Sequence, residues 1–472
     1  MEHFDIKSDK AAGFINQQEI IRILSYAKEH CLEKNLALEI LKKAEQMQGL
    51  SAEETAVLLL NQDEQLTDQI FTLATKIKNA YYGNRVVLFA PLYLSNYCVN
   101  GCTYCPYHAS NHNIPRLKMS QEQIKAEVIA LQDMGHKRLA LEAGEHPLYN
   151  PLSYILESIE TIYSIHHQSG SIRRVNVNIA ATTVENYKLL QAAKIGTYIL
   201  FQETYNQKQY EKLHPHGPKA NYAYHTEAMD RAMSAGIEDV GLGVLFGLHN
   251  YAYELVALLL HAKHLETKFG AGPHTISVPR LRPADGINVQ NFPDALPDDL
   301  FLKIVALLRI AVPYTGIIMS TRETETIRKK SLKLGVSQIS GGSKTSVGGY
   351  TANDEQTEES AQFETADNRS LDEIVGWLMQ LGYIPSFCTA CYGKGRQGID
   401  FMKICKEQQI HNFCAPNALL TLEEYLQNYA SSKTRYIGSM LFNAETSKLP
   451  EVQKKILFSR IKDAKNGSVK FF

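Results

Sequence analysis

Eight short apolar segments alternate with longer helical patterns between residues 86 and 340, and this alternation constrains the fold more than any other feature. Repeated strand-helix units of this kind form a parallel sheet. Eight such units over about 250 residues favour an α/β fold with a closed (β/α)8 barrel of TIM type over an open sheet. The predicted strands are residues 86–93, 138–142, 174–179, 197–201, 240–245, 275–279, 316–319 and 336–340.

The regions on either side of the predicted barrel, which occupies residues 81–350, have a different pattern. Residues 1–80 contain helical patterns, including a capping box at residues 51–54, and predict an N-terminal helical extension. A polar stretch opens residues 351–472, and helical patterns with a second group of cysteines follow it. We therefore expect a mainly helical C-terminal domain that carries a cluster-binding site.

The charge and hydropathy of the chain exclude two classes of partner. Its 472 residues include 49 Lys and Arg against 50 Asp and Glu, so no overall basic field is available to hold nucleic acid. The first thirty residues contain no uninterrupted apolar segment like that of a signal peptide. No later segment approaches the roughly 18 apolar residues of a spanning helix, so we expect a cytoplasmic protein without a membrane segment.

Six of the eight cysteines fall into two groups, and Cys31 and Cys405 stand alone in helical patterns where we expect core residues. In a long chain without a signal peptide, grouped cysteines indicate metal or redox chemistry rather than a disulfide framework. The first group is Cys98, Cys102 and Cys105, and the second is Cys388, Cys391 and Cys414.

The first group lies in the segment CVNGCTYCPY, directly after the first predicted strand. Thiolates bind zinc and iron–sulfur clusters. A tetrahedral zinc site needs a fourth ligand, for which His108 and His112 are candidates. A cubane cluster held by three cysteines instead keeps one iron open for a small molecule. The loop after a barrel strand lies at the catalytic face, and this position favours the cluster.

The Cys-x3-Cys-x2-Cys spacing, with an aromatic residue before the last cysteine, resembles the radical S-adenosylmethionine (SAM) superfamily. The segment AGE at residues 143–145 is similar to the Gly-Gly-Glu turn of that family, and the run GLGVLFG at residues 241–247 is similar to its adenine contacts. The resemblance implies a 4Fe-4S cluster that binds SAM and cleaves it to a 5′-deoxyadenosyl radical. The SAM-binding residues that it implies are Tyr104, Ala143, Gly144, Glu145, Arg231, Arg280 and Arg282.

Five further segments, FQETYN, HPHGPK, SVPRLRPADG, STRE and ISGGS, resemble the aromatic amino-acid lyases of this superfamily along nearly the whole barrel. This resemblance implies L-tyrosine as substrate and cleavage of its Cα–Cβ bond to p-cresol and dehydroglycine. The tyrosine carboxylate needs a cation, and arginine offers a bidentate fit, so we expect Arg322 to bind it. Glu203, which faces either SAM or tyrosine, Ser340 and Ser343 complete the expected catalytic residues.

The Cys-x2-Cys-x22-Cys spacing of the second group resembles the lyases that mature FeFe-hydrogenase. It implies a second 4Fe-4S cluster with an additional iron. The dehydroglycine fragment is converted there to CO and cyanide on iron, for assembly of the hydrogenase H-cluster. Lys394 and Arg396 lie nearby in sequence and would offset the negative charge of the cluster. A zinc site with His411 as fourth ligand is the alternative.

His274 precedes the sixth predicted strand, which places it at the barrel end opposite the first cysteine group. If the C-terminal domain covers that end, His274 faces the second cluster. The resemblance implies that a histidine holds the additional iron, and we expect His274 to be this ligand, with His261 and His264 as rivals. The same scheme requires a continuous polar cavity through the barrel between the two cysteine groups.

The resemblance also implies partners, and the motifs leave two other functions open. The implied partners are SAM, L-tyrosine, a free cysteine ligand at the second cluster, a low-potential electron donor and other hydrogenase maturases. A thiamine-pathway 2-iminoacetate synthase would cleave tyrosine without forming CO or cyanide. A non-catalytic iron–sulfur scaffold or carrier would hold two clusters without cleaving SAM.

Overall fold

The computed structural model of the chain describes residues 8, 10–352, 355–393, 397–407, 411–465 and 471. Lys394, Arg396 and the side chain of His411, which the sequence places near the second cysteine group, lie outside this description. None of the helices in the described ranges combines the length and apolar character that crossing a membrane requires.

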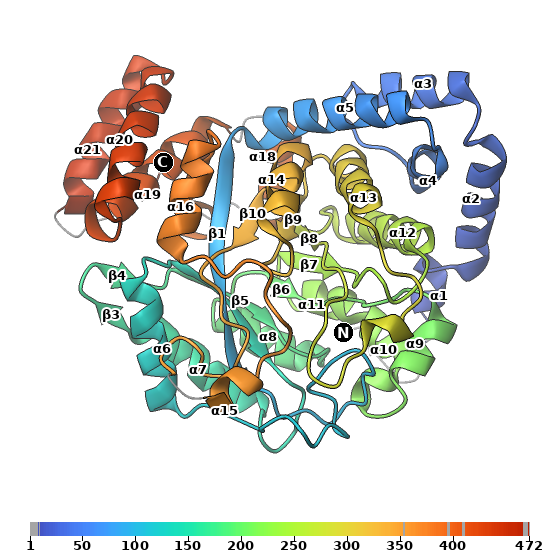
Figure 1. Ribbon diagram of the computed structural model, residues 1–472, viewed down its shortest axis with the longest axis horizontal. Coiled ribbons are helices and arrows are strands. Elements are labelled where there is room, and N and C mark those ends of the chain that lie inside the picture. Colours follow the sequence, from blue (N-terminus) through green and yellow to red (C-terminus); the bar gives the residue numbers. More distant parts are fainter. Residues whose placement is uncertain are drawn as a thin grey trace.

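Eight parallel strands close into a barrel, which confirms the predicted α/β fold (Figure 1). Each predicted apolar segment contains one strand, and the barrel closes where Leu88 of the first strand pairs with Ile339 of the last. Such segments form strands because they are buried against the barrel interior on one face and helices on the other. The strands are β1 (Arg85–Ser95), β2 (Arg138–Ala143), β5 (Arg174–Asn178), β6 (Tyr198–Ile199), β7 (Val240–Gly243), β8 (Thr275–Ser277), β9 (Gly316–Met319) and β10 (Gln338–Ser340).

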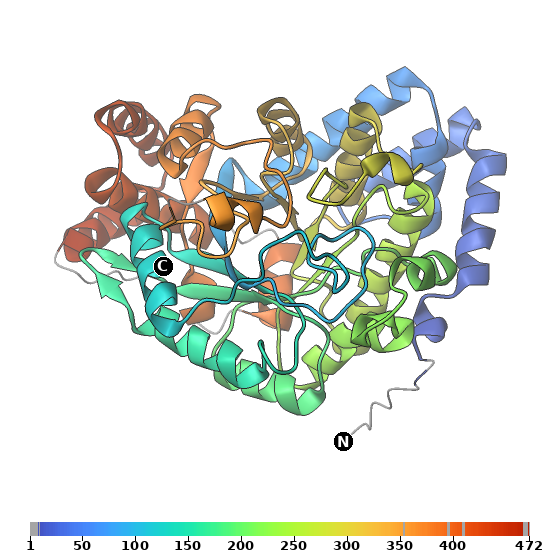
Figure 2. The same cartoon turned by 60° about the horizontal axis from the view of Figure 1, so that its bottom comes forward.

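Helices connect consecutive strands and surround the barrel. In Figure 2 the molecule is turned so that the barrel end with most of the connecting loops faces the reader. Local signals set the helix ends: helix α6 begins after Ser120, whose Oγ accepts from the backbone N–H of Gln123 in a capping box. The outer elements are α6 (Gln121–Asp133), α7 (Leu152–Ser164), β3 (His166–His167), β4 (Gly170–Ser171), α8 (Val184–Ala192), α9 (Gln207–Leu213), η1 (Pro218–Ala220), α10 (Tyr222–Thr226), α11 (Ala228–Ser234), α12 (Tyr251–Phe269), η2 (Val289–Asn291), α13 (Asp298–Ala311) and α14 (Glu325–Leu334).

Helices also precede the barrel, and the longest of them, α5, packs against α13 and leads directly into β1 (Figure 1). Cys31, at the end of α2, is buried, as expected for a core residue. These helices are α1 (Ala11–Phe14), α2 (Gln17–His30), α3 (Lys34–Ala44), α4 (Ala52–Leu60) and α5 (Glu64–Tyr82).

The C-terminal segment adds one strand at the start of β1. Strand β11 (Ile384–Ser386) pairs in parallel with β1, where Arg85 faces Ile384. Cys388 follows this strand, so the second cysteine group is carried to the barrel end opposite the first. Cys405 on α18 is buried, as expected. The other elements are α15 (Glu355–Glu359), α16 (Leu371–Gln380), α17 (Ala390–Gly393), α18 (Gly398–Lys406), α19 (His411–Asn428), α20 (Ser432–Ser447) and α21 (Glu451–Lys465).

A buried group of charges fixes helix α19, which carries Cys414, to the barrel. Glu424 on this helix accepts two hydrogen bonds from the Arg173 guanidinium, at 2.9 and 2.5 Å. Its carboxylate also lies 3.4 Å from Lys137 Nζ, and the Lys137 and Glu424 side chains are only 2% and 8% exposed. Because Lys137 loses its hydration on folding, its charge depends on this carboxylate.

We expect Glu424→Ala to lower the free energy of unfolding by about 3–5 kcal/mol, because it leaves the buried Lys137 and Arg173 charges without their carboxylate partner. Glu445, which pairs with the exposed Lys448 in the same region, provides the control. Glu445→Ala should cost about 1 kcal/mol or less. Urea denaturation measures both changes, and equal losses would contradict the role assigned to Glu424.

Candidate active site and second cysteine cavity

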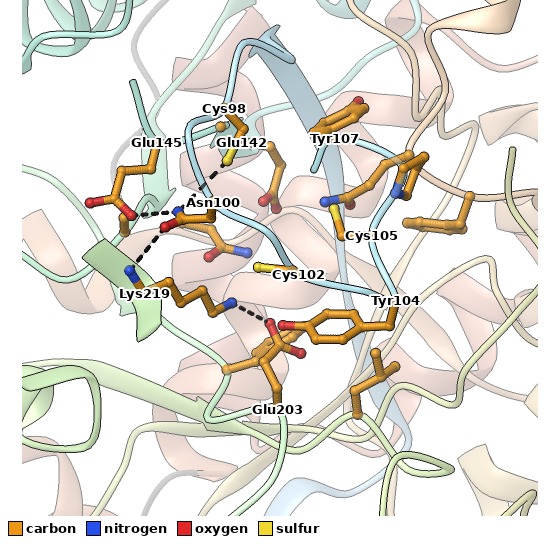
Figure 3. A pocket seen from close by; sticks show the side chains of 18 of the residues that line it. Cys98, Asn100, Cys102, Tyr104, Cys105, Tyr107, Glu142, Glu145, Glu203 and Lys219 are labelled. Atoms are coloured by element: carbon orange, nitrogen blue, oxygen red, sulfur yellow. Dashed lines mark hydrogen bonds and ion pairs between the residues drawn. The ribbon is translucent and has the colours of Figure 1, made fainter. Parts of the chain in front are cut away.

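The first cysteine group lies on the loop between β1 and α6, at the C-terminal end of the barrel strands. Cys98, Cys102 and Cys105 line one cavity of about 160 Å³, which we name the first cysteine cavity (Figure 3). The backbone N–H of Val99 donates to the carbonyl of Glu145 at 2.8 Å, so this loop is held to the loop that follows β2. The barrel therefore presents three thiols to one cavity, as the spacing predicts.

The three thiols fit an iron–sulfur cluster. Burial raises the pKa of the Cys105 thiol to about 11, so the thiol keeps its proton until a metal replaces it. Among the side chains that the structure describes, no three His, Cys, Asp or Glu residues converge closely enough to hold a single metal ion. The thiols instead line the wall of a cavity with room for a larger body, and iron–sulfur clusters take Cys thiolates as ligands.

A chain of polar contacts runs along the same cavity (Figure 3). Asn100 Nδ2 donates to Glu145 Oε2 at 2.7 Å, and Asn100 Oδ1 accepts from the backbone N–H of Lys219 at 2.9 Å. Lys219 Nζ lies 2.8 Å from Glu203 Oε1. The structure thus joins the predicted residues Glu145 and Glu203 through two residues that sequence reasoning missed. Both lie inside quoted motifs, CVNGC and HPHGPK, which is the signal that could have found them.

Two backbone features show how tightly this cavity is built. Glu203 has φ +68°, a left-handed conformation that costs a non-glycine residue energy and is concentrated at functional sites. At Gly144, an added Cβ would lie 2.4 Å from the carbonyl oxygen of Tyr97 and 3.1 Å from Cys98 Cβ. A glycine is therefore required where the loop after β2 meets the cysteine loop.

Tyr104 and Ala143, two of the predicted SAM contacts, also line the first cysteine cavity. The Tyr104 hydroxyl lies 2.8 Å from His214 Nε2. Burial lowers the pKa of His214 to about 3, so this imidazole is neutral and forms a hydrogen bond without carrying charge. The Tyr104 ring is thereby anchored at the end of the cysteine loop.

The three predicted SAM-contact arginines have different surroundings. Arg282 lines the first cysteine cavity while its guanidinium donates to Glu323 at 2.6 Å. Arg280 donates to the same carboxylate at 2.9 Å, and Arg231 donates to the carbonyl of Thr182 at 2.8 Å. In the described structure, neither Arg231 nor Arg280 belongs to the cavity lining, so their roles stay predictions.

A middle cavity of about 90 Å³ continues from the first cysteine cavity into the barrel, and Glu142 and Arg322 line both. The Arg322 guanidinium lies 3.5 Å from the centroid of the Phe363 ring. Burial raises the pKa of Glu142 to about 8, although Arg322 opposes this shift. Ser340 lines the middle cavity. Ser343 does not, and its buried Oγ has no hydrogen-bond partner among the described residues.

The second cysteine group lies at the opposite end of the barrel. Cys388, Cys391 and Cys414 line a cavity of about 60 Å³ together with His274, and we name it the second cysteine cavity. His274 Nδ1 is 3.5 Å from Asp239 Oδ1. Burial lowers the pKa of His274, and a neutral imidazole is the form that binds metals. Three thiols and an imidazole therefore face one space, a donor set that fits iron.

On β1, Val87 lines the second cysteine cavity and Phe89 lines the middle cavity, two residues further along the strand. Among the described residues, the two cavities share no lining residue. The continuous cavity expected from the sequence stays a prediction. The rival histidines His261 and His264 lie on α12 and are not part of the second cysteine cavity's described lining.

Comparisons with known proteins agree with this geometry. The family described as the Radical SAM superfamily matches residues 92–261, and the Biotin and Thiamin Synthesis associated domain matches residues 277–384. The 2-iminoacetate synthase of Escherichia coli (strain K12) is 30% identical over 320 residues, which are 67% of this chain and 81% of that enzyme. The 3-methylornithine synthase of Methanosarcina acetivorans is 30% identical over 268 residues, 56% of this chain and 71% of that enzyme.

Solved structures extend the likeness to nearly the whole chain. A crystal structure of HydG, a maturase of the FeFe-hydrogenase, is 52% identical, with a TM-score of 0.94 over 98% of this chain and 100% of that one. HydG from Carboxydothermus hydrogenoformans is 38% identical, with a TM-score of 0.82 over 96% and 99% of the two chains.

The barrel, its three-cysteine loop and these relatives define a radical SAM enzyme, which uses a 4Fe-4S cluster and SAM. The chain belongs to the radical SAM superfamily and, within it, to the group of aromatic amino-acid lyases. It is a carbon–carbon lyase, and its similarity to HydG includes the C-terminal region that carries the second cysteine cavity.

Gly144→Ala should weaken SAM binding, because the new Cβ pushes the Tyr97 carbonyl and the Cys98 loop out of place. We expect the dissociation constant for SAM to rise at least about tenfold, or 1.4 kcal/mol. Anaerobic calorimetry on reconstituted protein measures it. Gly13→Ala is the control, since nothing lies within 4 Å of its added Cβ. An unchanged constant in Gly144→Ala would show that the close contact is not needed.

The Glu142 carboxyl should make stability depend on pH. Its pKa rises from 4.5 to about 8 on folding, so its stabilising contribution is complete below pH 4.5 and is lost as the pH rises through about 8. We expect the unfolding free energy of the wild type to fall relative to that of Glu142→Gln between about pH 5 and 8 and then to level off. Urea denaturation at a series of pH values tests this, and a difference independent of pH would refute it.

Proposed function

We propose that this enzyme cleaves the Cα–Cβ bond of L-tyrosine to p-cresol and dehydroglycine, and that the smaller fragment is converted to CO and cyanide for FeFe-hydrogenase assembly. The observation that supports this most strongly is the presence of two three-thiol cavities at opposite ends of one barrel. The HydG structures, which resemble the chain along its whole length, support the hydrogenase role. The 2-iminoacetate synthases support tyrosine cleavage.

In the first step, Cys98, Cys102 and Cys105 would hold the SAM-binding cluster, and we assign SAM contacts to Glu145 and Tyr104, which line the same cavity. When bound, the cluster would supply the electron for reductive cleavage of SAM, the chemistry needed to take hydrogen from the tyrosine amino group. The chain itself binds and orients the reactants and limits the access of water to them. A low-potential protein donor provides the electron.

The tyrosine carboxylate binds to Arg322 in this proposal. The guanidinium lies where the first cysteine cavity opens into the middle cavity, and Phe363 packs on its face and limits its movement. An arginine in this position offers a charge-assisted, bidentate contact to a carboxylate. Glu203, Ser340 and Ser343 are the further polar residues that we assign to the reactants, and each remains to be tested by substitution.

The second step takes place at the far end of the barrel. Cys388, Cys391 and Cys414 hold a second 4Fe-4S cluster, and His274, which lines the same cavity, is the proposed protein ligand of an additional iron. A free cysteine completes the ligands of that iron. Other hydrogenase maturases receive the product.

Cys388→Ser should separate the two steps, because it removes a ligand of the second cluster without touching the first cysteine cavity. With SAM, tyrosine and dithionite under anaerobic conditions, we expect the variant to keep most of its p-cresol formation and to lose at least about 90% of its CO, a tenfold effect. Cresol by chromatography and CO by haemoglobin binding are measured in the same samples. Cys31→Ser, which alters a buried cysteine at the end of α2 and outside the described lining of the second cavity, is the control.

Other outcomes would identify a different function. A wild type that forms p-cresol without CO would act as a 2-iminoacetate synthase, the activity named for the Escherichia coli relative. A wild type in which tyrosine does not stimulate 5′-deoxyadenosine formation would not be a tyrosine lyase, and an iron–sulfur scaffold would then explain the two cysteine groups.

A further inference from the structure

Arg85 occupies an unusual position, at the first residue of β1 and beside the second cysteine cavity. Its backbone pairs with Ile384 of β11, four residues before Cys388. Its side chain lines the cavity together with the three thiols and Arg138. The pairing of β1 with β11 therefore fixes a guanidinium next to the second cysteine group.

Two N–H-bearing atoms of the Arg85 guanidinium have no hydrogen-bond acceptor among the described residues. Its Nε and Nη2 atoms are buried, and neither has an acceptor among the residues that the structure describes. The guanidinium lies 5.3 Å from the centroid of the Tyr82 ring, which is a weak contact compared with an ion pair. Arginine stays charged in proteins, and a buried charge without a partner destabilises a fold. A negatively charged partner is therefore expected in the working protein.

The lining of the cavity shows where that partner would be. It contains two arginines, Arg85 and Arg138, and no Asp or Glu among its described residues. The thiols of Cys388 and Cys414 are among the groups of this lining whose negative charge would act on Arg85. The first cysteine cavity differs, because its buried cation Lys219 has a carboxylate partner, Glu203, at 2.8 Å. At the second cavity, the compensating charge has to come from thiolates and from what they hold.

We infer that Arg85 is a positioning residue for the second cluster: its free N–H groups donate to the anionic group held by Cys388, Cys391 and Cys414. The inference rests on the second cluster of the proposed function. A cation that donates to cluster sulfur stabilises the reduced, more negative state, so Arg85 raises the reduction potential of this cluster. It also couples cluster binding to stability, since the charge is unfavourable without the cluster and favourable with it.

The first test uses the sign of a stability change. In iron-free protein, Arg85→Met removes an unpaired buried charge, so we expect its Tm to equal or exceed that of the wild type. After anaerobic reconstitution, the increase in Tm should be smaller for Arg85→Met than for the wild type. An Arg85→Met protein that is clearly less stable than the wild type without iron would overturn the inference, because Arg85 would then have a structural partner in the iron-free fold.

The second test measures the reduction potential of the cluster. In full-length protein with Cys98, Cys102 and Cys105 replaced by Ala, the iron–sulfur signal comes from the second cysteine group. In this background, we expect Arg85→Met to lower the midpoint potential by at least about 59 mV, which is a tenfold change in the equilibrium for one electron. Arg85→Lys, which keeps the charge without the planar donors, should have a midpoint potential between those of the background protein and the Arg85→Met variant.

Lys406→Met is the control, since it removes one positive charge from helix α18 at a half-exposed position outside the described lining of the cavity. Its potential should equal that of the background protein. An equal shift of the midpoint potential in both methionine variants would show that Arg85 acts only through its overall charge and would overturn the inference. No shift in either variant would also refute it. If the background protein with Arg85 intact binds no cluster, the second cluster of the proposed function fails instead, so the two failures are distinguishable.

Discussion

The pairing of β1 with β10 is the constraint on which the rest of the structure depends. It turns eight parallel strands into a closed wall, so the interior is reached from the two ends. Because parallel strands all point the same way, the loops that follow them gather at one end, and the first cysteine group joins that set. The other end would be a plain structural face in most barrels. Here β11 extends the wall beside the start of β1 and brings the second cysteine group under it.

Strand β1 connects the two ends physically. Arg85 and Val87 line the second cysteine cavity, Phe89 lines the middle cavity, and Tyr93 reaches the first. At about 3.3 Å per residue, the eight steps from Arg85 to Tyr93 span roughly 26 Å. Side chains at the two ends of β1 are therefore too far apart to contact each other or to exchange protons directly. In the proposed function, the chemistry at the two ends is therefore linked by a small molecule that moves between them.

Much of this architecture could be predicted from sequence because its signals are local. Each barrel strand is a short apolar run, and the three cysteines of the first group lie within eight residues, from Cys98 to Cys105. The features that sequence reasoning missed depend on distant segments. Asn100 matters because its amide bridges Glu145 and the backbone of Lys219. Likewise, Arg85 reads as the polar start of a strand until β11 places thiols beside it.

The two cysteine cavities differ in how charge is balanced, and this difference follows from what each has to bind. In the first, Lys219 is neutralised by Glu203, so a ligand such as SAM, whose amino-acid moiety is zwitterionic, meets both signs of charge already in place. In the second, arginines face thiols and no carboxylate belongs to the described lining, so the cavity favours a body with net negative charge. A neutral or cationic occupant would leave the guanidinium of Arg85 without compensation. The two ends of the barrel therefore offer different charge environments: the first cavity is lined by both signs of charge, and the described lining of the second has arginines beside thiols.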